Sequence, residues 1–400
     1  MRKILSKSKL LKKVYHKFKA LSSNSKISFT NSYWFVFASE FKIKVRGNPN
    51  EQDNNKKALW VIPDFSKGSG GHLNIFRFVF FIKQTCGIDS DILIFGNNQW
   101  NNDPIMAKQK LNEFFYPFDG NVSFFTSADS EFFTEKKYRY VFATSWQTAY
   151  FVRLFNAAIY KLYFIQDFEP FFYALGSEYS FAEQTYKFSF IAITAGGWLS
   201  GLAKNKYGMD TFSFNFAFEP SVQDTAVVKL SNSNPRILFY ARPPTLRRGF
   251  ELGVFALSEL YRRFSGNIDI VFVGWDVSNY EIPFKYENLG IVEYSELNAL
   301  YASCDVALVL SFTNMSLLPL EILSCGCEVV LNIGDNNTWL DNGLLFHYVE
   351  PDICQIADKL EDILKSNTSF KYPLFERHPI RQITWEHEGQ RVGNYLLGLK

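Results

Sequence analysis

The sequence predicts an α/β protein made of two doubly wound parallel sheets, each covered by helices. The first observation is a rhythm, from residue 58 onward, in which short apolar runs alternate with helical stretches. The second is that this rhythm stops at a polar segment, residues 219–235, and then restarts. The third is the length of 400 residues, which is enough for two or three domains. Two domains of similar size account for all three observations.

The expected strands are short and almost wholly apolar. They are residues 58–63, 91–95, 140–144, 161–165 and 190–194 in the first half, and residues 236–240, 269–274, 305–310, 328–332 and 344–349 in the second. Helices are expected from Leu73 to Lys83 and from Arg381 to Leu397. Apolar and polar residues alternate over residues 27–46, which predicts a short hairpin. Ligands of doubly wound sheets bind beyond the carboxyl ends of the strands, so a site is expected in the loops that follow these runs.

The composition is that of a globular chain with a basic N-terminal arm. Hydrophobic residues make up 47% and charged residues 20%, which excludes a largely disordered protein. Residues 1–26 hold nine of the 42 basic residues and no acidic one, so 33 basic residues face 40 acidic ones in the remainder. This acidic remainder argues against nucleic acid as a partner. As a helix, residues 1–21 would suit an anionic membrane surface, and a solvated basic tail is the alternative.

The sequence predicts a cytoplasmic protein. It has no uncharged apolar run of the roughly 18 residues that span a bilayer, and its start does not match a signal peptide. The basic arm would allow peripheral association with the inner face of the cell membrane. The five cysteines are scattered, without a Cys-x-x-Cys pair, which predicts reduced thiols rather than disulfides or a metal site.

A glycine-rich loop follows the first expected strand. Gly70, Gly71 and His72 open the helix that comes next. Backbone N–H groups and the helix dipole at such a start favour an anion such as phosphate, although a tight turn without a ligand is the alternative. A dinucleotide site would need a third glycine where Leu73 stands and an acidic residue where Asn97 stands. The sequence therefore argues against a nicotinamide cofactor.

Two further groups follow strands in the second half. Arg242, Arg247 and Arg248 follow residues 236–240, and their planar cationic groups suit a diphosphate, with a solvated basic loop as the alternative. Ser316 is expected to cap the start of a short helix that contains Glu321. A carboxylate at that place can accept hydrogen bonds from two ribose hydroxyls; a surface ion pair is the alternative.

Three motifs occur in order in the second half: residues 289–292 (Leu-Gly-Ile-Val), residues 296–305 (Glu-Leu to Asp) and residues 318–330 (Leu-Pro-Leu-Glu to Val-Val). With the basic loop they resemble the GT-B glycosyltransferases of glycosyltransferase family 4, and the resemblance runs from about residue 56 to the end. Residues 163–170 and 176–179 are more specifically similar to bacterial rhamnosyltransferases that build rhamnan and S-layer glycans from dTDP-L-rhamnose.

This resemblance implies a GT-B fold, in which two Rossmann-like domains face a cleft and a C-terminal helix crosses back to the first domain. On that division, residues 1–26 are the basic amphipathic arm and residues 27–218 the acceptor-binding domain. Residues 219–378 then form the domain that binds the nucleotide sugar, and residues 379–400 the crossover helix.

The resemblance also implies the activity. It predicts transfer of L-rhamnose from dTDP-L-rhamnose to a growing cell-surface polysaccharide, with retention at the anomeric carbon. The expected partners are a nucleotide-sugar donor and a glycan or lipid-linked glycan acceptor. No metal or other cofactor is expected, because the Asp-x-Asp pair, Asp89 and Asp91, begins a strand and so lies at the wrong end of the sheet. The alternatives are a transferase that uses another nucleotide sugar and a non-catalytic carbohydrate-binding subunit.

The donor-binding residues are assigned by the same resemblance. Arg242 and Arg248 correspond to the basic residues that hold the diphosphate, and Glu321 to the residue that holds ribose. The other expected donor contacts are Gly70, Gly71, His72, Arg247, Ile291, Val292, Thr313, Asn314, Ser316 and Leu317. The family has a glutamate where Thr313 stands, so one usual contact to the donor sugar is missing. A 6-deoxy sugar of L configuration would explain this change, and so would loss of activity.

The expected catalytic residues are Asp167, Glu169 and Arg248. The two acidic residues follow a first-domain strand and are candidates to orient or deprotonate the acceptor hydroxyl. Capping of local N–H groups is the alternative for both. The arginine would stabilise the negative charge that develops on the departing diphosphate.

Overall fold

The computed structural model describes residues 33–37, 56–96, 100, 102–125, 138–217, 234–341, 343–366 and 371–399. The chain falls into two compact units, residues 1–41 and residues 42–400. In the first unit, Trp34–Phe37 form helix α3, where the sequence predicted a strand of a hairpin. A short apolar run cannot be assigned to helix or strand by periodicity, which explains the error. The rest of that hairpin and the arm of residues 1–26 lie outside the described residues.

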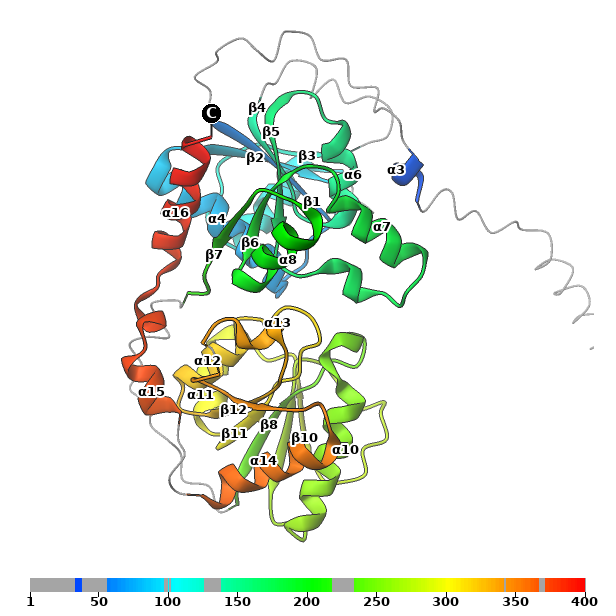
Figure 1. Ribbon diagram of the computed structural model, residues 1–400, viewed down its shortest axis with the longest axis vertical. Helices are drawn as coiled ribbons and strands as arrows, with labels where there is room; N and C mark the ends of the chain where they lie inside the picture. The colour runs from blue at the N-terminus through cyan, green and yellow to red at the C-terminus, as the bar shows by residue number, and fades with distance from the viewer. Residues whose placement is uncertain are drawn as a thin grey trace, which may run out of the picture. The chain divides into compact units, whose positions relative to one another are not determined.

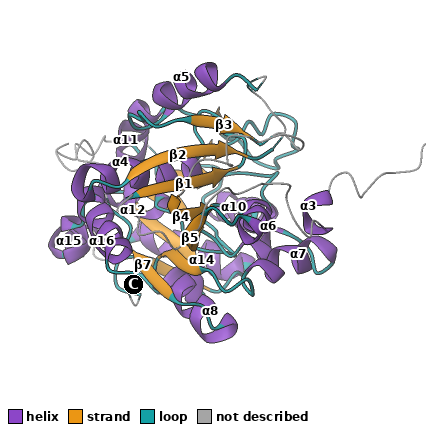
Figure 2. Cartoon of the chain, turned by 90° about the horizontal axis from the view of Figure 1, so that it is seen from above, coloured by secondary structure: helices purple, strands orange, loops and turns teal. Residues whose placement is uncertain are grey.

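The second unit contains two parallel sheets, and the first has seven strands in the order β3-β2-β1-β4-β5-β6-β7. Figure 2 shows β3, β2, β1, β4 and β5 of this sheet side by side. The strands are β1 (Lys57–Ile62), β2 (Asp89–Ile94), β3 (Val122–Phe124), β4 (Tyr138–Ala143), β5 (Ala158–Ile165), β6 (Ile191–Ala195) and β7 (Thr211–Phe214). The strand order reverses between β1 and β4, as it does in doubly wound folds.

Helices and aromatic side chains cover the first sheet. The helices are α4 (Gly70–Cys86), α5 (Pro104–Phe114), α6 (Trp146–Leu154), η2 (Glu169–Phe172), α7 (Ser177–Thr185) and α8 (Gly197–Tyr207). In the core the Trp60 ring stacks on Phe142 with ring centroids 4.0 Å apart. Most of the largest fully buried side chains of the described residues are phenylalanine or tyrosine, so the abundant aromatic residues largely fill this core.

The second sheet has six strands in the order β10-β9-β8-β11-β12-β13, all parallel. They are β8 (Arg236–Tyr240), β9 (Asp269–Val273), β10 (Glu287–Gly290), β11 (Val306–Leu308), β12 (Glu328–Asn332) and β13 (His347–Val349). The connecting helices are η3 (Leu246–Arg248), α10 (Phe250–Arg263), α11 (Tyr294–Ala302), α12 (Leu318–Ser324), α13 (Asp335–Thr338) and α14 (Ile353–Lys365). Both sheets therefore confirm the predicted α/β fold class.

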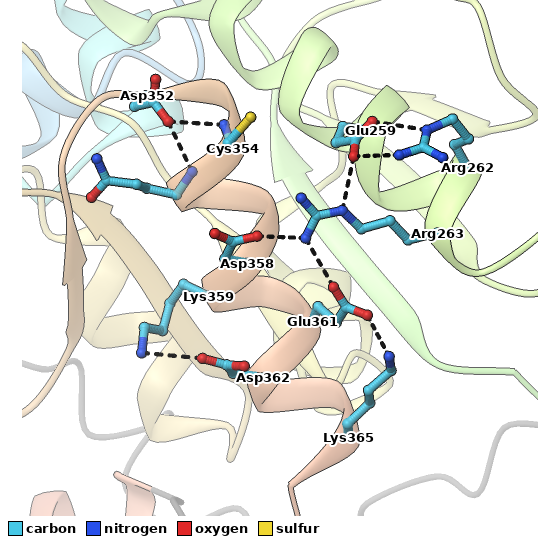
Figure 3. A network of polar contacts seen from close by, with 11 residues as sticks. Glu259, Arg262, Arg263, Asp352, Cys354, Asp358, Lys359, Glu361, Asp362 and Lys365 are labelled. Carbon is cyan, nitrogen blue, oxygen red and sulfur yellow. Dashed lines mark hydrogen bonds and ion pairs between the residues drawn. The ribbon is translucent and has the colours of Figure 1, made fainter.

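An ionic network joins two helices of the second sheet (Figure 3). Arg263 at the end of α10 donates to Asp358 at 2.6 Å and to Glu361 at 2.9 Å, both on α14. The same guanidinium also pairs with Glu259 on its own helix at 2.9 Å. These side chains lie partly in solvent, so each pair contributes little by itself. The network chiefly fixes the register between α10 and α14, whose apolar faces share one core.

The chain ends with α15 (Tyr372–Arg377), η4 (Pro379–Gln382) and α16 (Trp385–Leu397), and α16 lies beside α4 in Figure 1. Trp385 is buried at the start of α16, which lies within the helix expected over residues 381–397. Gly389 and Gly393 allow close approach, because a Cβ atom at either position would collide with Phe81 or Cys86 of α4. Within the described segments, no helix is both long enough and apolar enough to cross a membrane.

Candidate functional site

Most of the predicted site residues lie in loops that follow strands, at the carboxyl edges of the two sheets. Asp167 follows β5, Arg242 follows β8 and Thr313 follows β11. The Asp-x-Asp pair is different, because it begins β2, as predicted. Asp91 is buried there beneath Lys57 at 2.9 Å and accepts a hydrogen bond from Tyr138, so it serves the sheet rather than a carboxyl-edge site.

Four residues, Asp167, Arg247, Thr313 and Asn314, form a contact between the two sheets, called here the inter-sheet contact. The Asp167 carboxylate accepts from the Thr313 hydroxyl and from the Asn314 backbone N–H, both at 2.9 Å. Its Oδ2 also lies 3.5 Å from Arg247 Nε. Burial raises the pKa of Asp167, although the positive charge of Arg247 opposes that shift. Both carboxylate oxygens are thus engaged, which makes Asp167 an anchoring group in this structure.

Asn314 binds the first sheet with its side chain as well. Its Nδ2 donates to the carbonyl oxygens of Gln166 at 3.1 Å and Ala195 at 3.0 Å. The loop that carries Asn314 is held in turn by amide side chains: Asn332 and Asn337 donate to the Ser311 carbonyl, and Asn336 donates to the carbonyls of Ser311 and Thr313. The loop is therefore rigidly defined by the end of β12 and by α13.

The three arginines contain buried N–H groups without hydrogen-bond partners. Within the described part of the chain these are Arg242 Nε, Arg247 Nε and Arg248 Nη1. The Arg247 guanidinium lies over the Phe172 ring, 3.9 Å from its centroid, which leaves its edge to bind other groups. Buried donors of this kind are rare in native proteins and need an explanation. Burial lowers the pKa of Arg247, and so do the positive charges of Arg248 and Arg242, so the three cations lie near enough to repel one another and a bound anion would offset that repulsion.

The start of α4 is held by His72. The ring Nε2 lies 3.3 Å from the Pro63 carbonyl, which can only accept, so Nδ1 accepts from the Ser69 hydroxyl at 2.8 Å. Burial lowers the pKa of His72 and favours this neutral ring. Since Ser69 is the N-cap residue and makes no cap hydrogen bond, its side chain does not cover the first-turn N–H groups of Gly70 and Gly71. The His72 ring thus connects Ser69 at the start of α4 to Pro63 at the end of the preceding strand.

Glu169 is engaged within the first sheet. Its Oε2 accepts from the Trp146 backbone N–H at 2.5 Å and from the Tyr163 hydroxyl at 2.8 Å. Burial raises the pKa of Glu169 to about 8, against the effect of these two donors. The carboxyl group therefore keeps its proton to a higher pH than an exposed glutamate does, and it caps the start of α6.

The start of α12 differs from the prediction for Ser316. The residue that precedes the helix is Leu317, without a side-chain cap, and Ser316 Oγ is buried with no hydrogen-bond partner. The braced loop before it and Pro319 in the first turn delay the start of the helix, so the expected Ser316 cap is wrong. Glu321 lies in α12, as expected, and the structure places it half-buried in the first turn.

The expected nucleobase residues, Ile291 and Val292, follow β10. The Ile291 side chain is 79% exposed. The next residue, Glu293, pairs with Lys67 of the glycine-rich loop at 3.2 Å. This exposed pair brings the loop of the first sheet close to the loop after β10, although it adds little stability.

Sequence reasoning missed Gln166 and the three asparagines that brace residues 311–314. Gln166 binds the start of α4, with Nε2 donating to the Gly71 carbonyl at 3.0 Å and Oε1 accepting from Asn74 at 3.1 Å. An available signal was its position directly after β5. For Asn332, Asn336 and Asn337 the signal was a cluster of amides at the end of a buried strand.

The chain is similar in sequence and in fold to known proteins. Residues 235–361 match the family model described as "WsaF, C-terminal domain". The chain is 32% identical over 361 residues to the O-antigen biosynthesis protein RfbC of Myxococcus xanthus. The matched region covers 85% of this chain and 27% of RfbC, so the chain spans about a quarter of that relative.

Solved structures share the fold at low identity. HepE of Anabaena, solved with UDP-glucose, superposes with a TM-score of 0.62 at 15% identity, over 86% of this chain and 100% of HepE. A glycosyltransferase of Rickettsia africae gives a TM-score of 0.60 at 14% identity, over 87% of this chain and 100% of the other. The chain is thus a homologue of an O-antigen biosynthesis protein, and its fold is the GT-B fold of glycosyltransferases.

Proposed function

We propose that this chain is a glycosyltransferase that moves a sugar from a nucleoside diphosphate to an acceptor hydroxyl during assembly of a cell-surface polysaccharide. The GT-B fold and the relationship to RfbC support the reaction class and the pathway. The observation that carries the proposal is the cluster of Arg242, Arg247 and Arg248, each with a buried N–H group that makes no hydrogen bond, although Arg247 Nε also lies 3.5 Å from Asp167. A diphosphate supplies several acceptor oxygens and compensating charge at once.

The proposed chemistry needs charge stabilisation at the leaving group. As the bond to the anomeric carbon breaks, negative charge develops on the diphosphate, and preorganised donors lower the energy of that state. The arginines would act from the second sheet. Gly70, Gly71 and the backbone of His72 would act from the first, where the 17-residue helix α4 begins.

The remaining donor contacts and the division of the chain are proposed as follows. Glu321 holds ribose, Ile291 and Val292 flank the base, and Asn314, Ser316 and Leu317 line the sugar side. Residues 27–218 bind the acceptor, residues 219–378 bind the donor and residues 379–400 cross back. Asp167 and Glu169 orient the acceptor by fixing the loop after β5, because the Asp167 oxygens already accept hydrogen bonds from Phe168, Thr313 and Asn314.

The proposed donor is dTDP-L-rhamnose, used by a family 4 rhamnosyltransferase with retention and without a metal ion. The sequence resemblance at residues 163–170 supports the sugar. Thr313 also supports it, because Thr313 uses its hydroxyl on Asp167, so the sugar would meet a different set of groups from those that a glutamate offers. The acceptor is a glycan or lipid-linked glycan at the inner face of the membrane.

A binding screen tests the proposal. Thermal shift and calorimetry with dTDP-L-rhamnose, UDP-glucose, dTDP and UDP should identify a ligand that stabilises the protein. Arg247→Ala and Arg248→Ala each remove charge-assisted hydrogen bonds of about 1.5–3 kcal/mol, so affinity should fall roughly 10- to 150-fold. Arg262→Ala is the matched control, since this exposed residue of α10 pairs with Glu259 and lies away from the carboxyl ends of the strands.

Transfer assays then separate activity from binding. Release of the nucleoside diphosphate with a glycan acceptor supports the enzyme. Binding without transfer or hydrolysis of any nucleotide sugar would favour a carbohydrate-binding subunit. Equal affinity of the arginine variants and Arg262→Ala would contradict the proposed diphosphate site.

A further inference from the structure

Four side chains form a continuous path from α16 to the loop after β5. Trp385 of α16 lies against the Arg77 guanidinium, whose central carbon is 4.5 Å from the ring centroid. Arg77 Nη1 donates to Asn74 Oδ1 at 2.7 Å, and Asn74 Nδ2 donates to Gln166 Oε1 at 3.1 Å. Gln166 Nε2 then donates to the Gly71 carbonyl at 3.0 Å. We call these four residues the α16 relay.

Arg77 determines which groups of the relay donate hydrogen bonds and which accept them. A guanidinium only donates, so Asn74 must turn its oxygen toward Arg77 and its amino group toward Gln166. The Gln166 amide is oriented in the same way, with its oxygen toward Asn74 and its amino group toward Gly71. Arg77 is only 3% exposed, so this order forms where water competes weakly.

The relay ends at groups of the candidate site. Gly71 belongs to the first turn of α4, and Asp167 of the inter-sheet contact is the next residue after Gln166. The Gln166 carbonyl also accepts from Asn314 Nδ2 at 3.1 Å. One residue thus fixes the glycine-rich loop, the end of β5 and the loop after β11.

We propose that Arg77, Asn74 and Gln166 are positioning residues that transmit the docking of α16 to the diphosphate site. This inference rests on the proposed function and adds a route of control to it: when Trp385 is seated, the relay holds the first turn of α4 and Asp167 in the arrangement that binds the nucleoside diphosphate. By thermodynamic reciprocity, a bound nucleoside diphosphate must also stabilise the docked α16.

Asn74→Asp breaks the relay at one bond without removing its anchor. The new carboxylate still accepts from Arg77, and as an ion pair, but it has no N–H to offer Gln166 Oε1. The variant should therefore keep the melting temperature of the wild type. Its affinity for UDP or dTDP should fall about three- to thirtyfold, the range expected for residues that couple two sites.

Trp385→Phe perturbs the other end, and Tyr395→Leu is its matched control. Tyr395 lies on the same helix and stacks on Phe212 with centroids 4.5 Å apart, outside the relay. Trp385→Phe should lower nucleotide affinity in the wild type but not in the Asn74→Asp background. Tyr395→Leu should leave the affinity unchanged in both.

Amide hydrogen exchange tests the relay without any nucleotide. Trp385→Phe should speed exchange at residues 70–74 and 166–168 in the wild type, but add nothing in Asn74→Asp. If the wild type binds no nucleotide while this exchange pattern holds, the proposed function fails and the relay stands as a structural connection. Additive effects of the two substitutions, or unchanged exchange at both segments, would overturn the relay itself.

Discussion

Replacing Gly196 with alanine tests how closely the loop after β6 meets the second sheet. Gly196 precedes α8 with φ 89° and ψ 170°, a backbone region almost reserved for glycine. A Cβ atom there would lie within 3.0 Å of three ring carbons of Trp339, which follows α13. The ring packs also against Phe216, with centroids 5.5 Å apart.

The cost of Gly196→Ala has two parts. The backbone strain is about 1–3 kcal/mol. Forcing a methyl group into the Trp339 ring adds about 1–3 kcal/mol of overpacking, because the ring must move away from the loop. We therefore expect a loss of about 4 kcal/mol in the free energy of unfolding, which is large beside the stability of an ordinary domain.

Urea unfolding followed by circular dichroism measures the loss, and two further variants separate its parts. Gly208→Ala is the control, because Gly208 at the other end of α8 has φ 68° and open space around its Cβ position. Gly208→Ala should lower the free energy of unfolding by only about 1–2 kcal/mol, the cost of the left-handed backbone conformation. In a double-mutant cycle, Trp339→Ala should remove the clash, so Gly196→Ala should lose about 1–3 kcal/mol less stability in that background. Equal losses for the two glycine variants, with no coupling to Trp339, would refute this account.

Two further predictions concern charge. Glu169→Gln should flatten the pH dependence of stability. Folding raises the pKa of Glu169 from 4.5 to about 8, so between these pH values only the unfolded chain releases the proton. The wild type therefore loses stability as the pH rises through this range. Urea midpoints from pH 5 to 9 measure this, and parallel curves for both proteins would contradict it. Anionic vesicles should sediment the full chain more than a chain that begins at residue 27, since the arm carries nine basic residues. Neutral vesicles are the control, and equal sedimentation would remove the proposed membrane role.

The strands that sequence reasoning found are those with enough apolar residues to define a period. All ten expected strands correspond to strands of the two sheets, with ends that shift by a few residues. The strands it missed, β3, β7 and β10, have only three or four residues and lie at sheet edges. Strands this short define a period only where apolar residues extend beyond them, as residues 344–346 do before the edge strand β13.

The sequence predicted where the site lies, but not which of its residues form hydrogen bonds with one another. Placing Asp167 and Thr313 after parallel strands puts each at the carboxyl edge of its sheet. Their hydrogen bond joins residues 146 positions apart, and it depends on how the two sheets meet. The failed Ser316 cap has a similar cause, because the asparagines that fix the preceding loop come from β12 and α13.

The loop of residues 311–314 belongs to both halves of the molecule at once. Asn314 is 2% exposed and bonds to three different residues of the first sheet, while Thr313 beside it holds Asp167. Any exchange at position 313 made to alter sugar preference will therefore also remove or change the hydrogen bond to Asp167 that joins the two sheets. Redesign of this chain for another donor therefore has to preserve the contact between the sheets while it changes the sugar preference.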